Sequence, residues 1–147
     1  MGTWHNTTER RADYRLALIP RRDTQGAYKG YKNWIEKDIR RLVKTAGGLV
    51  MALEMHNNHV YMRFVLPTDT DIKTFVSWLK RQSAYMLQQR LDHAGFDRHI
   101  AGFWSEGHYI DQSDGNRRAL VDFVYNELLD AQQRADIEAY SRKEAAT

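Results

Sequence analysis

Two β-rich runs joined by a short polar stretch constrain the fold of this chain most. Residues 49–55 and 59–66 are rich in Val, Leu and Met, and Asn57 and Asn58 lie between them. Two such runs with so short a connection are typical of an antiparallel hairpin. The sequence therefore predicts that these residues form two neighbouring strands of an antiparallel sheet.

The rest of the chain alternates between strand and helix patterns. Apolar residues alternate before Pro20, as in a strand, and recur at helical spacing after Tyr31 and after Asp71. Turn residues such as Gly47 mark the ends of these patterns. Residues 21–30 and 92–102 are expected to be loops. The predicted elements are strands at 14–19, 49–55, 59–66 and 103–112, and helices at 31–46, 72–87 and from about 117 onward. This order predicts the α+β class, with helices packed on one antiparallel sheet.

The length of 147 residues suits one domain spanning 1–147. Within it, residues 1–11 are expected to be loose, and residues 131–147 to form a helical extension. The longest apolar runs are too short for a membrane span, and the first residues lack a signal-peptide layout. The chain has no cysteine, which excludes disulfides and thiolate metal sites. A cytoplasmic protein without membrane contact is the expectation.

Basic residues occur in pairs, although the formal net charge is only +3. Clustered Arg and Lys suit the neutralisation of phosphate groups, so nucleic-acid binding is one interpretation. For any single pair, a solvated helix surface is the simpler interpretation. The five pairs are Arg10-Arg11, Arg21-Arg22, Arg40-Arg41, Lys80-Arg81 and Arg117-Arg118.

The segment His59-Val60-Tyr61 is the most informative for function. Residues i and i+2 of a strand point to the same face, so a His-x-His pair there can converge on one divalent cation. His59 and Tyr61 offer only one good ligand, because a phenol is mostly protonated at neutral pH. A partly buried strand histidine and an ordinary strand aromatic are the simpler interpretation of the same pair.

Three separated segments resemble the small single-tyrosine HUH transposases, the TnpA-like proteins of insertion sequences and their REP-associated relatives. Ala52–Glu54 followed by His59 is similar to the strand that carries the family's His-hydrophobic-His motif. Trp78–Ala84 resembles its Leu-Lys-Gly-x-Ser-small motif, and Phe103–Ile110 resembles its Trp-x-x-x-Tyr-hydrophobic strand. The resemblance runs from about Ala12 to Asp130, and it implies the HUH fold, which is ferredoxin-like or RRM-like.

The resemblance also implies an activity. These transposases are homodimers that bind a hairpin in single-stranded DNA and nick beside it. A helical tyrosine attacks the phosphorus, and a divalent metal (Mg or Mn) polarises the scissile phosphate. The two strand histidines and a Gln four residues after the tyrosine hold that metal. Nucleophile and Gln share one helix face because they stand at i and i+4.

Carried over to this sequence, the site is degenerate. An ungapped count from Phe103 puts the nucleophile position on Phe123 and the Gln position on Glu127. Phe123 has no oxygen and cannot form a phosphotyrosine bond, whereas Glu127 can still ligate a hard cation. His59 stands at the first histidine position and Tyr61 at the second. The resemblance therefore implies a metal site that is weak or absent.

Two residues of the sequence could replace the missing nucleophile and the missing ligand. Tyr125 is available as a nucleophile, but two helix positions turn it about 200° away from the face of Phe123. His56 is available as a ligand if a turn at Asn57-Asn58 places it beside His59, since a regular strand would point them to opposite faces. Either substitution would repair part of the site.

The expected function is recognition of single-stranded or hairpin DNA by a transposase-like protein that does not nick. Two rivals remain: an active metal-dependent single-strand transposase or nickase that uses Tyr125, and a protein-interaction module. Trp104 is a candidate for stacking on unpaired bases, although packing in the sheet is the stronger expectation for it. The remaining candidate DNA-binding residues are Lys80, Arg81, Ser83, Arg117 and Arg118.

Overall fold

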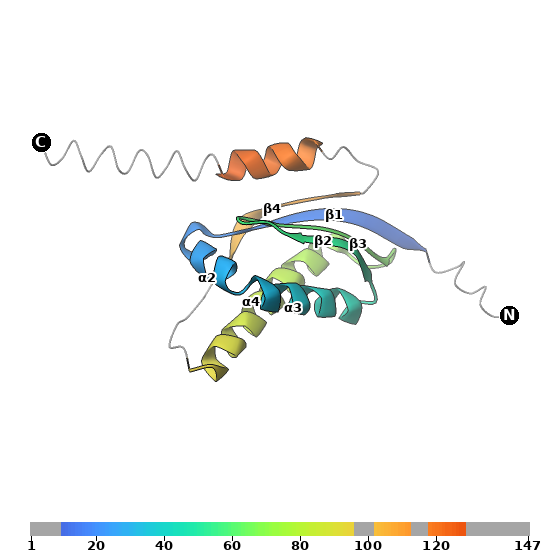
Figure 1. Ribbon diagram of the computed structural model, residues 1–147. Coiled ribbons are helices and arrows are strands. Elements are labelled where there is room, and N and C mark those ends of the chain that lie inside the picture. The colour runs from blue at the N-terminus through green and yellow to red at the C-terminus, as the bar shows by residue number, and fades with distance from the viewer. Residues whose placement is uncertain (1–9, 96–101, 113–117, 129–147) are drawn as a thin grey trace, which may run out of the picture. The chain divides into compact units, whose positions relative to one another are not determined.

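The computed structural model describes residues 10–95, 102–112 and 118–128 of the chain. Two compact units make up the chain, Met1–Gly115 and Asn116–Thr147, and each is considered by itself. The first unit holds a four-stranded sheet with helices (Figure 1). Within the second, residues 118–128 are helical, with Leu120 and Val124 buried as the helical spacing predicts.

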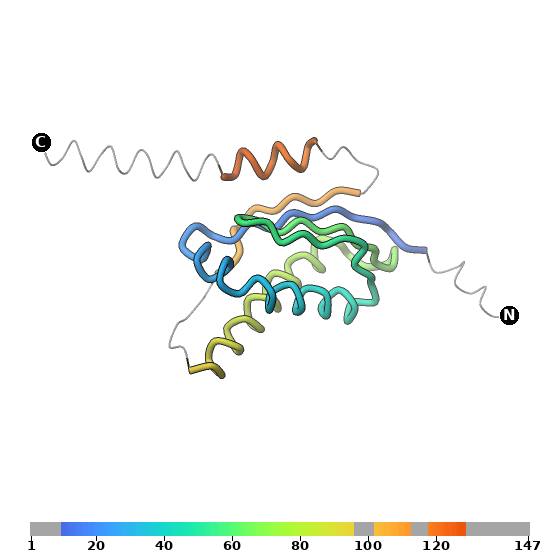
Figure 2. The backbone as a smooth tube through the Cα atoms, in the orientation of Figure 1, coloured from blue at the N-terminus to red at the C-terminus, as the bar shows by residue number. Residues whose placement is uncertain are grey.

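The sheet has the order β2-β3-β1-β4, and every neighbouring pair is antiparallel. Helices α3 and α4 pack side by side on one face of this sheet, as the backbone trace shows (Figure 2). The predicted α+β class with a ferredoxin-like strand order is therefore confirmed. The elements are β1 (Arg11–Pro20), η1 (Arg22–Thr24), α2 (Gln25–Gly30), α3 (Lys32–Thr45), β2 (Leu49–Met55), β3 (Val60–Pro67), α4 (Ile72–His93) and β4 (Trp104–Gln112).

The alternation of apolar residues decides which side chains form the core. Val60, Met62 and Phe64 of β3 belong to one buried cluster with residues of α3 and α4. Since successive strand residues point to opposite faces, Tyr61 and Arg63 lie on the other face of the sheet. The sheet therefore has a helix-covered face and a second face, called here the outer face, which carries the candidate site.

Local signals in the sequence fix the ends of the helices. Gly47 adopts a φ of 85° directly after α3, a conformation that favours glycine. The Asp71 side chain accepts hydrogen bonds from the backbone N–H groups of Lys73 and Thr74 and caps α4. Both helix boundaries were predicted and are confirmed.

Three sequence expectations were wrong in their bounds. Helix α4 ends at His93, inside the loop expected at 92–102. Most of residues 21–30 is not a loop but the short helices η1 and α2. The fully buried ring of Tyr28 stabilises α2. The glycines of this segment suggested a loop, and they do not reveal that burial. Strand β1 begins at Arg11, which pairs with Pro67, so the loose N-terminus was placed one residue too far.

Several expectations fall outside the described residues, among them the extension at 131–147 and the position of Arg117. The expectation of one domain over 1–147 stays a prediction. Among the described residues, none of the helices has the length and apolar character needed to cross a membrane.

Candidate functional site

The register of the strands places Tyr61, the last residue of the His-x-Tyr segment, on the outer face. Tyr61 of β3 pairs with Ala17 of β1 and with Glu54 of β2, and directly opposed residues of an antiparallel pair share a face. Tyr61 is only 5% exposed, so its ring is held in place. His59 immediately precedes β3, at the tip of the β2–β3 hairpin.

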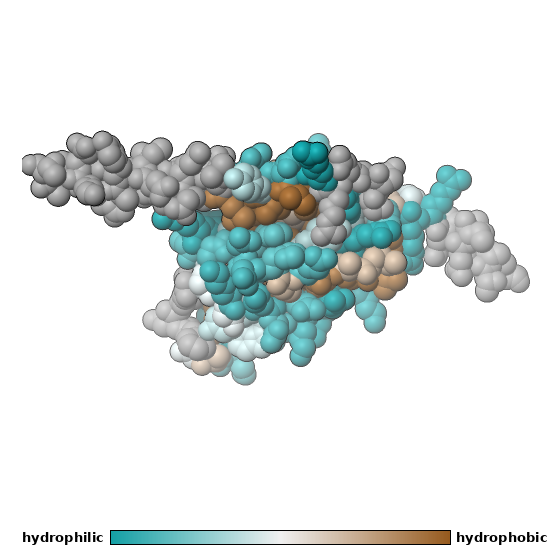
Figure 3. All heavy atoms as spheres, turned by 45° about the horizontal axis from the view of Figure 1, so that its top comes forward, coloured by the Kyte–Doolittle hydropathy of each residue, from teal (hydrophilic) through white to brown (hydrophobic). Residues whose placement is uncertain are grey.

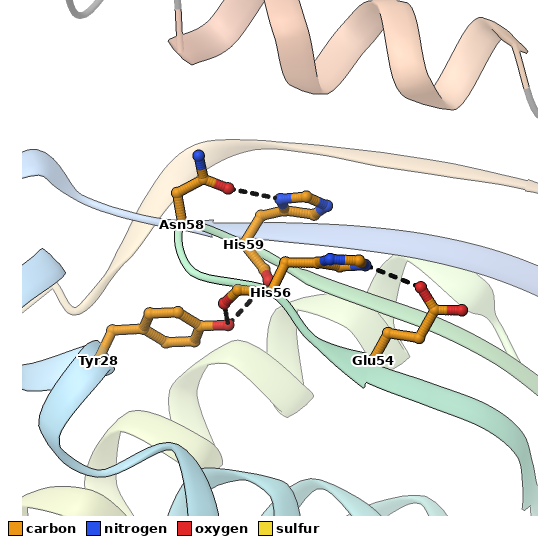
Figure 4. Close-up of polar contacts among 5 residues, drawn as sticks. All are labelled: Tyr28, Glu54, His56, Asn58 and His59. Atoms are coloured by element: carbon orange, nitrogen blue, oxygen red, sulfur yellow. Dashed lines mark hydrogen bonds and ion pairs between the residues drawn. The ribbon is translucent and has the colours of Figure 1, made fainter.

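The turn at Asn57 and Asn58 brings His56 to the side of His59. The two imidazole rings are stacked, with centroids 4.5 Å apart and planes 13° from parallel (Figure 4). The backbone N–H of His56 donates to the carbonyl of His59 at 2.9 Å and closes the turn. The sequence left open whether a turn would bring these two histidines together, and the structure shows that it does.

Tyr28 of α2 holds this turn from beneath. Its hydroxyl is 2.5 Å from the carbonyl oxygen of His56 and 2.8 Å from that of His59, so its single proton is shared between the two acceptors (Figure 4). Burial raises the pKa of Tyr28, which keeps the hydroxyl protonated as a donor. The sequence did not single out Tyr28, because its partners are backbone atoms about 30 residues away.

Hydrogen bonds define the state of the His59 ring. Its Nδ1 lies 2.8 Å from the amide oxygen of Asn58, so Nδ1 carries the proton and Nε2 keeps a lone pair. Burial, aided by the neighbouring His56, lowers the pKa of His59 to about 4, against an opposing effect of Glu54. Near pH 7 the His59 imidazole is thus neutral, the state in which histidine binds metals.

A divalent cation does not fit the donors of this unit in their observed arrangement. Imidazole lone pairs lie in the ring plane, so the stacked rings of His56 and His59 cannot both point at one ion. Nε2 of His56 is also engaged with Glu54 at 2.8 Å. Within residues 10–95, 102–112 and 118–128, no group of three or more His, Asp or Glu side chains is arranged to hold a metal ion.

The remaining catalytic candidates lie on helical residues 118–128 of the second unit. Phe123 and Glu127 are both half-buried and stand at i and i+4, so they share a helix face as expected. Tyr125 is 63% exposed and points about 200° away from Phe123 around the helix. The approach of these side chains to His59 and Tyr61 stays a prediction.

Two of the candidate DNA-binding residues are interior. Trp104 is 6% exposed and donates its indole N–H to the hydroxyl of Ser83 at 2.8 Å. Ser83 is 3% exposed, and its own hydroxyl donates to the carbonyl of Leu79. Packing between α4 and β4 uses both side chains, which was the stronger expectation for Trp104. A contact of Trp104 or Ser83 with DNA stays a prediction.

The basic candidates differ in how available they are. Lys80 is half-buried, and its ammonium donates to the carbonyl of Glu106 at 3.0 Å. Burial lowers the pKa of Lys80, which the nearby Glu106 opposes. Arg81 and Arg118 are exposed, and Arg117 lies outside the described residues. Contacts of these four with phosphate stay a prediction.

The outer face also carries two ion pairs that the motifs did not reveal. Arg15 forms two hydrogen bonds with Asp111, at 3.1 and 2.8 Å, and Tyr109 donates to the same carboxylate at 2.5 Å. Arg63 holds Asp13 at the same two distances. These polar residues alternate with apolar ones along their strands, so the alternation signalled that they share the outer face. It did not reveal which of them pair.

His59 gives the folded protein a predictable pH dependence. Because its pKa is near 4 when folded and near 6.5 when unfolded, the unfolded state gains a proton first as the pH falls. The part of the stability that depends on neutral His59 is therefore fully present above about pH 6.5 and is lost towards pH 4. Discounted for partial exposure, the loss is about 1–2 kcal/mol. Urea unfolding at pH 7 and 4.5 should show a smaller loss for His59→Asn than for the unchanged protein. Equal losses would contradict this role of His59.

Comparison with known proteins identifies the family. The sequence profile described as Transposase IS200 like matches residues 8–125. The transposases for insertion sequence element IS200 of Salmonella typhimurium and Salmonella typhi are each 22% identical over 115 residues, which is 78% of this chain and 76% of theirs.

Solved structures agree with this in fold. A protein described as a transposase from Deinococcus radiodurans has a TM-score of 0.66 at 17% identity, over 80% of this chain and 91% of that one. A REP-associated tyrosine transposase bound to a REP hairpin has a TM-score of 0.51 at 13% identity, over 82% and 68%. Since the profile covers most of its length, this chain belongs to the IS200-like transposase family.

Proposed function

We propose that this chain recognises single-stranded or hairpin DNA and does not nick it. The observation that carries the proposal is Tyr61, a buried phenol on the outer face at the position where the resemblance implies a second histidine. Membership of a transposase family supports DNA as the ligand. Hairpin recognition is supported by the REP-associated transposase of similar fold, which is bound to a REP hairpin.

Loss of cleavage rests on the chemistry of the residues present. A phosphotyrosine intermediate needs a hydroxyl, and Phe123 has none. His59 is neutral and offers one lone pair, but a single imidazole is a weak anchor for a hard cation. The protein then retains the fold and the basic surface of a transposase without its nucleophile.

Affinity is expected to depend strongly on salt, and no covalent adduct should form. If Lys80, Arg81, Arg117 and Arg118 each neutralise one phosphate, binding weakens about 100-fold between roughly 50 and 200 mM salt. The measurement is fluorescence anisotropy with a labelled DNA hairpin that carries single-stranded flanks. Incubation of the same DNA with Mn²⁺, followed by denaturing electrophoresis, detects any adduct.

Tyr125→Phe is the matched control that tests the alternative function, an active nickase that uses Tyr125. An adduct that forms with the unchanged protein and disappears in Tyr125→Phe would establish that rival. Tyr125 is 63% exposed, so the substitution leaves the fold intact. An adduct that persists in Tyr125→Phe would place the nucleophile elsewhere and would equally end the proposal of a protein that does not nick.

A protein-interaction module is the second candidate, and one surface favours it. Leu49 and Met51 are 56% and 53% exposed on β2, an edge strand of the sheet. Exposed apolar side chains on a free edge suit pairing with another chain. The same edge would serve a homodimer, which light scattering would detect as twice 17.3 kDa. Absence of salt-sensitive binding to single-stranded DNA or RNA would favour the interaction module.

A further inference from the structure

A hollow of about 380 Å³ lies between α3 and α4, on the helix-covered side of the sheet. Its size falls in the range of about 300–1,000 Å³ that is usual for ligand sites. The side chains that line it include Trp34 and Arg41 from α3, and Gln89, Arg90 and His93 from α4. The hollow is separated by the sheet from the outer face that carries His59 and Tyr61.

One wall of the hollow is planar and held in place. Arg90 forms two hydrogen bonds with Asp38, at 3.0 and 2.7 Å, and the Asp38 carboxylate is 1% exposed. The guanidinium of Arg90 lies 5.6 Å from the centre of the Trp34 ring, and Tyr31 stacks on Trp34 at 5.0 Å. Nucleobases stack on such indole and guanidinium planes. The wall therefore presents planar groups of the kind on which nucleobases stack.

The charge of the hollow favours an anion. No carboxylate lines it, since Asp38 lies behind Arg90. Arg41 is exposed and forms no ion pair within the part of the chain that the structure describes. Lys37 and Lys44 are also exposed, and they stand four residues before and three after Arg41, on the same side of α3. A row of cations on α3 thus includes Arg41, which lines the hollow together with Trp34.

We infer that this hollow binds one unpaired nucleotide of a DNA strand, with its base on the Trp34–Arg90 wall and its phosphate at Arg41. The inference extends the proposed function and rests on it, because it supplies a place where a single-stranded segment is held. Double-stranded DNA cannot use the hollow, since its bases are stacked and paired. The hollow therefore selects DNA with unpaired nucleotides.

The test compares two single-charge variants of the same helix. Arg41→Ala removes the cation of the hollow, whereas Arg40→Ala removes an exposed cation that pairs with Glu36 and does not line it. For a hairpin with a single-stranded tail, Arg41→Ala should weaken binding about tenfold, the usual cost of a charge-assisted contact. Arg40→Ala should weaken it at most about twofold. For a blunt-ended duplex without a loop, which has no unpaired nucleotide, the two variants should behave alike.

A positional measurement accompanies the affinities. A tail containing 5-iododeoxyuridine, irradiated in complex with the unchanged protein, should crosslink to the peptide that contains Trp34. Equal losses for Arg41→Ala and Arg40→Ala on the tailed hairpin, or crosslinks only to other peptides, would overturn the inference and leave the proposed function standing.

Failure of the proposed function itself gives a different result. If the tailed hairpin does not bind, thymidine 5′-monophosphate is titrated while the indole N–H resonance of Trp34 is followed. A saturable shift that Arg41→Ala weakens would keep the nucleotide site although DNA recognition had failed. No shift would reject the site together with the function.

Discussion

Nicking of single-stranded hairpin DNA is expected to return in part when Phe123→Tyr is combined with Tyr61→His, and to remain negligible with Phe123→Tyr alone. The first change supplies the missing hydroxyl, and the second supplies a second imidazole beside His59. An imidazole is smaller than the phenol of Tyr61, which is 5% exposed, so the fold has room for it. Under the proposed function both changes are needed, because the proposal holds that nucleophile and metal site are each incomplete.

The measurement is covalent capture of labelled hairpin DNA in the presence of Mn²⁺. The control is the same double variant with His59→Ala added, which should lose the restored activity. Strong activity from Phe123→Tyr alone would show that His59 and Glu127 already hold enough metal. Such a result would contradict the interpretation of Tyr61 as a lost ligand.

Asp111→Ala is expected to destabilise the fold by about 3 kcal/mol, whereas Asp13→Ala should have a much smaller effect. The two carboxylates hold Arg15 and Arg63 with the same pair of distances, 3.1 and 2.8 Å. They differ in burial, since the Arg15 side chain is 5% exposed and that of Arg63 is 46% exposed, and Asp111 also accepts a hydrogen bond from Tyr109. Loss of Asp111 leaves a buried guanidinium uncompensated, while loss of Asp13 leaves one that water can solvate.

Urea unfolding of the two variants at pH 7 measures this difference, provided that the dependence on denaturant is unchanged. The matched geometry makes each variant the control for the other. Similar losses for Asp111→Ala and Asp13→Ala would mean that burial of Arg15 does not decide the energy of its pair.

The strands and helices were largely predictable because their signals are local. Alternation marked β1 and β3, and helical spacing marked α3 and α4. Gly47 marked the end of α3 through its backbone conformation, and Asp71 marked the start of α4 through its side-chain cap. Helix α2 was missed, because its six residues are too short for a periodic pattern and its stability comes from the burial of Tyr28.

The candidate site was predictable only in part. Alternation placed Tyr61 on the outer face, and register confirms it beside Glu54. The stacking of His56 on His59 was not predictable, since it depends on a turn closed by backbone hydrogen bonds and supported by Tyr28. The burial of Trp104 was also not predictable. An aromatic residue in a strand gives the same sequence signal whether its indole N–H donates to water or to Ser83.

By itself, the sequence determined the order of the strands and of the two long helices, and the two faces of the sheet. Those properties follow from residue type and from periods of two or 3.6 residues, which act over one element. Only the tertiary structure decided that Trp104 is buried, that Arg15 pairs with Asp111, and that α3 and α4 enclose a basic hollow. Each of these depends on residues about 20 or more positions apart, and a local pattern carries no information about such contacts.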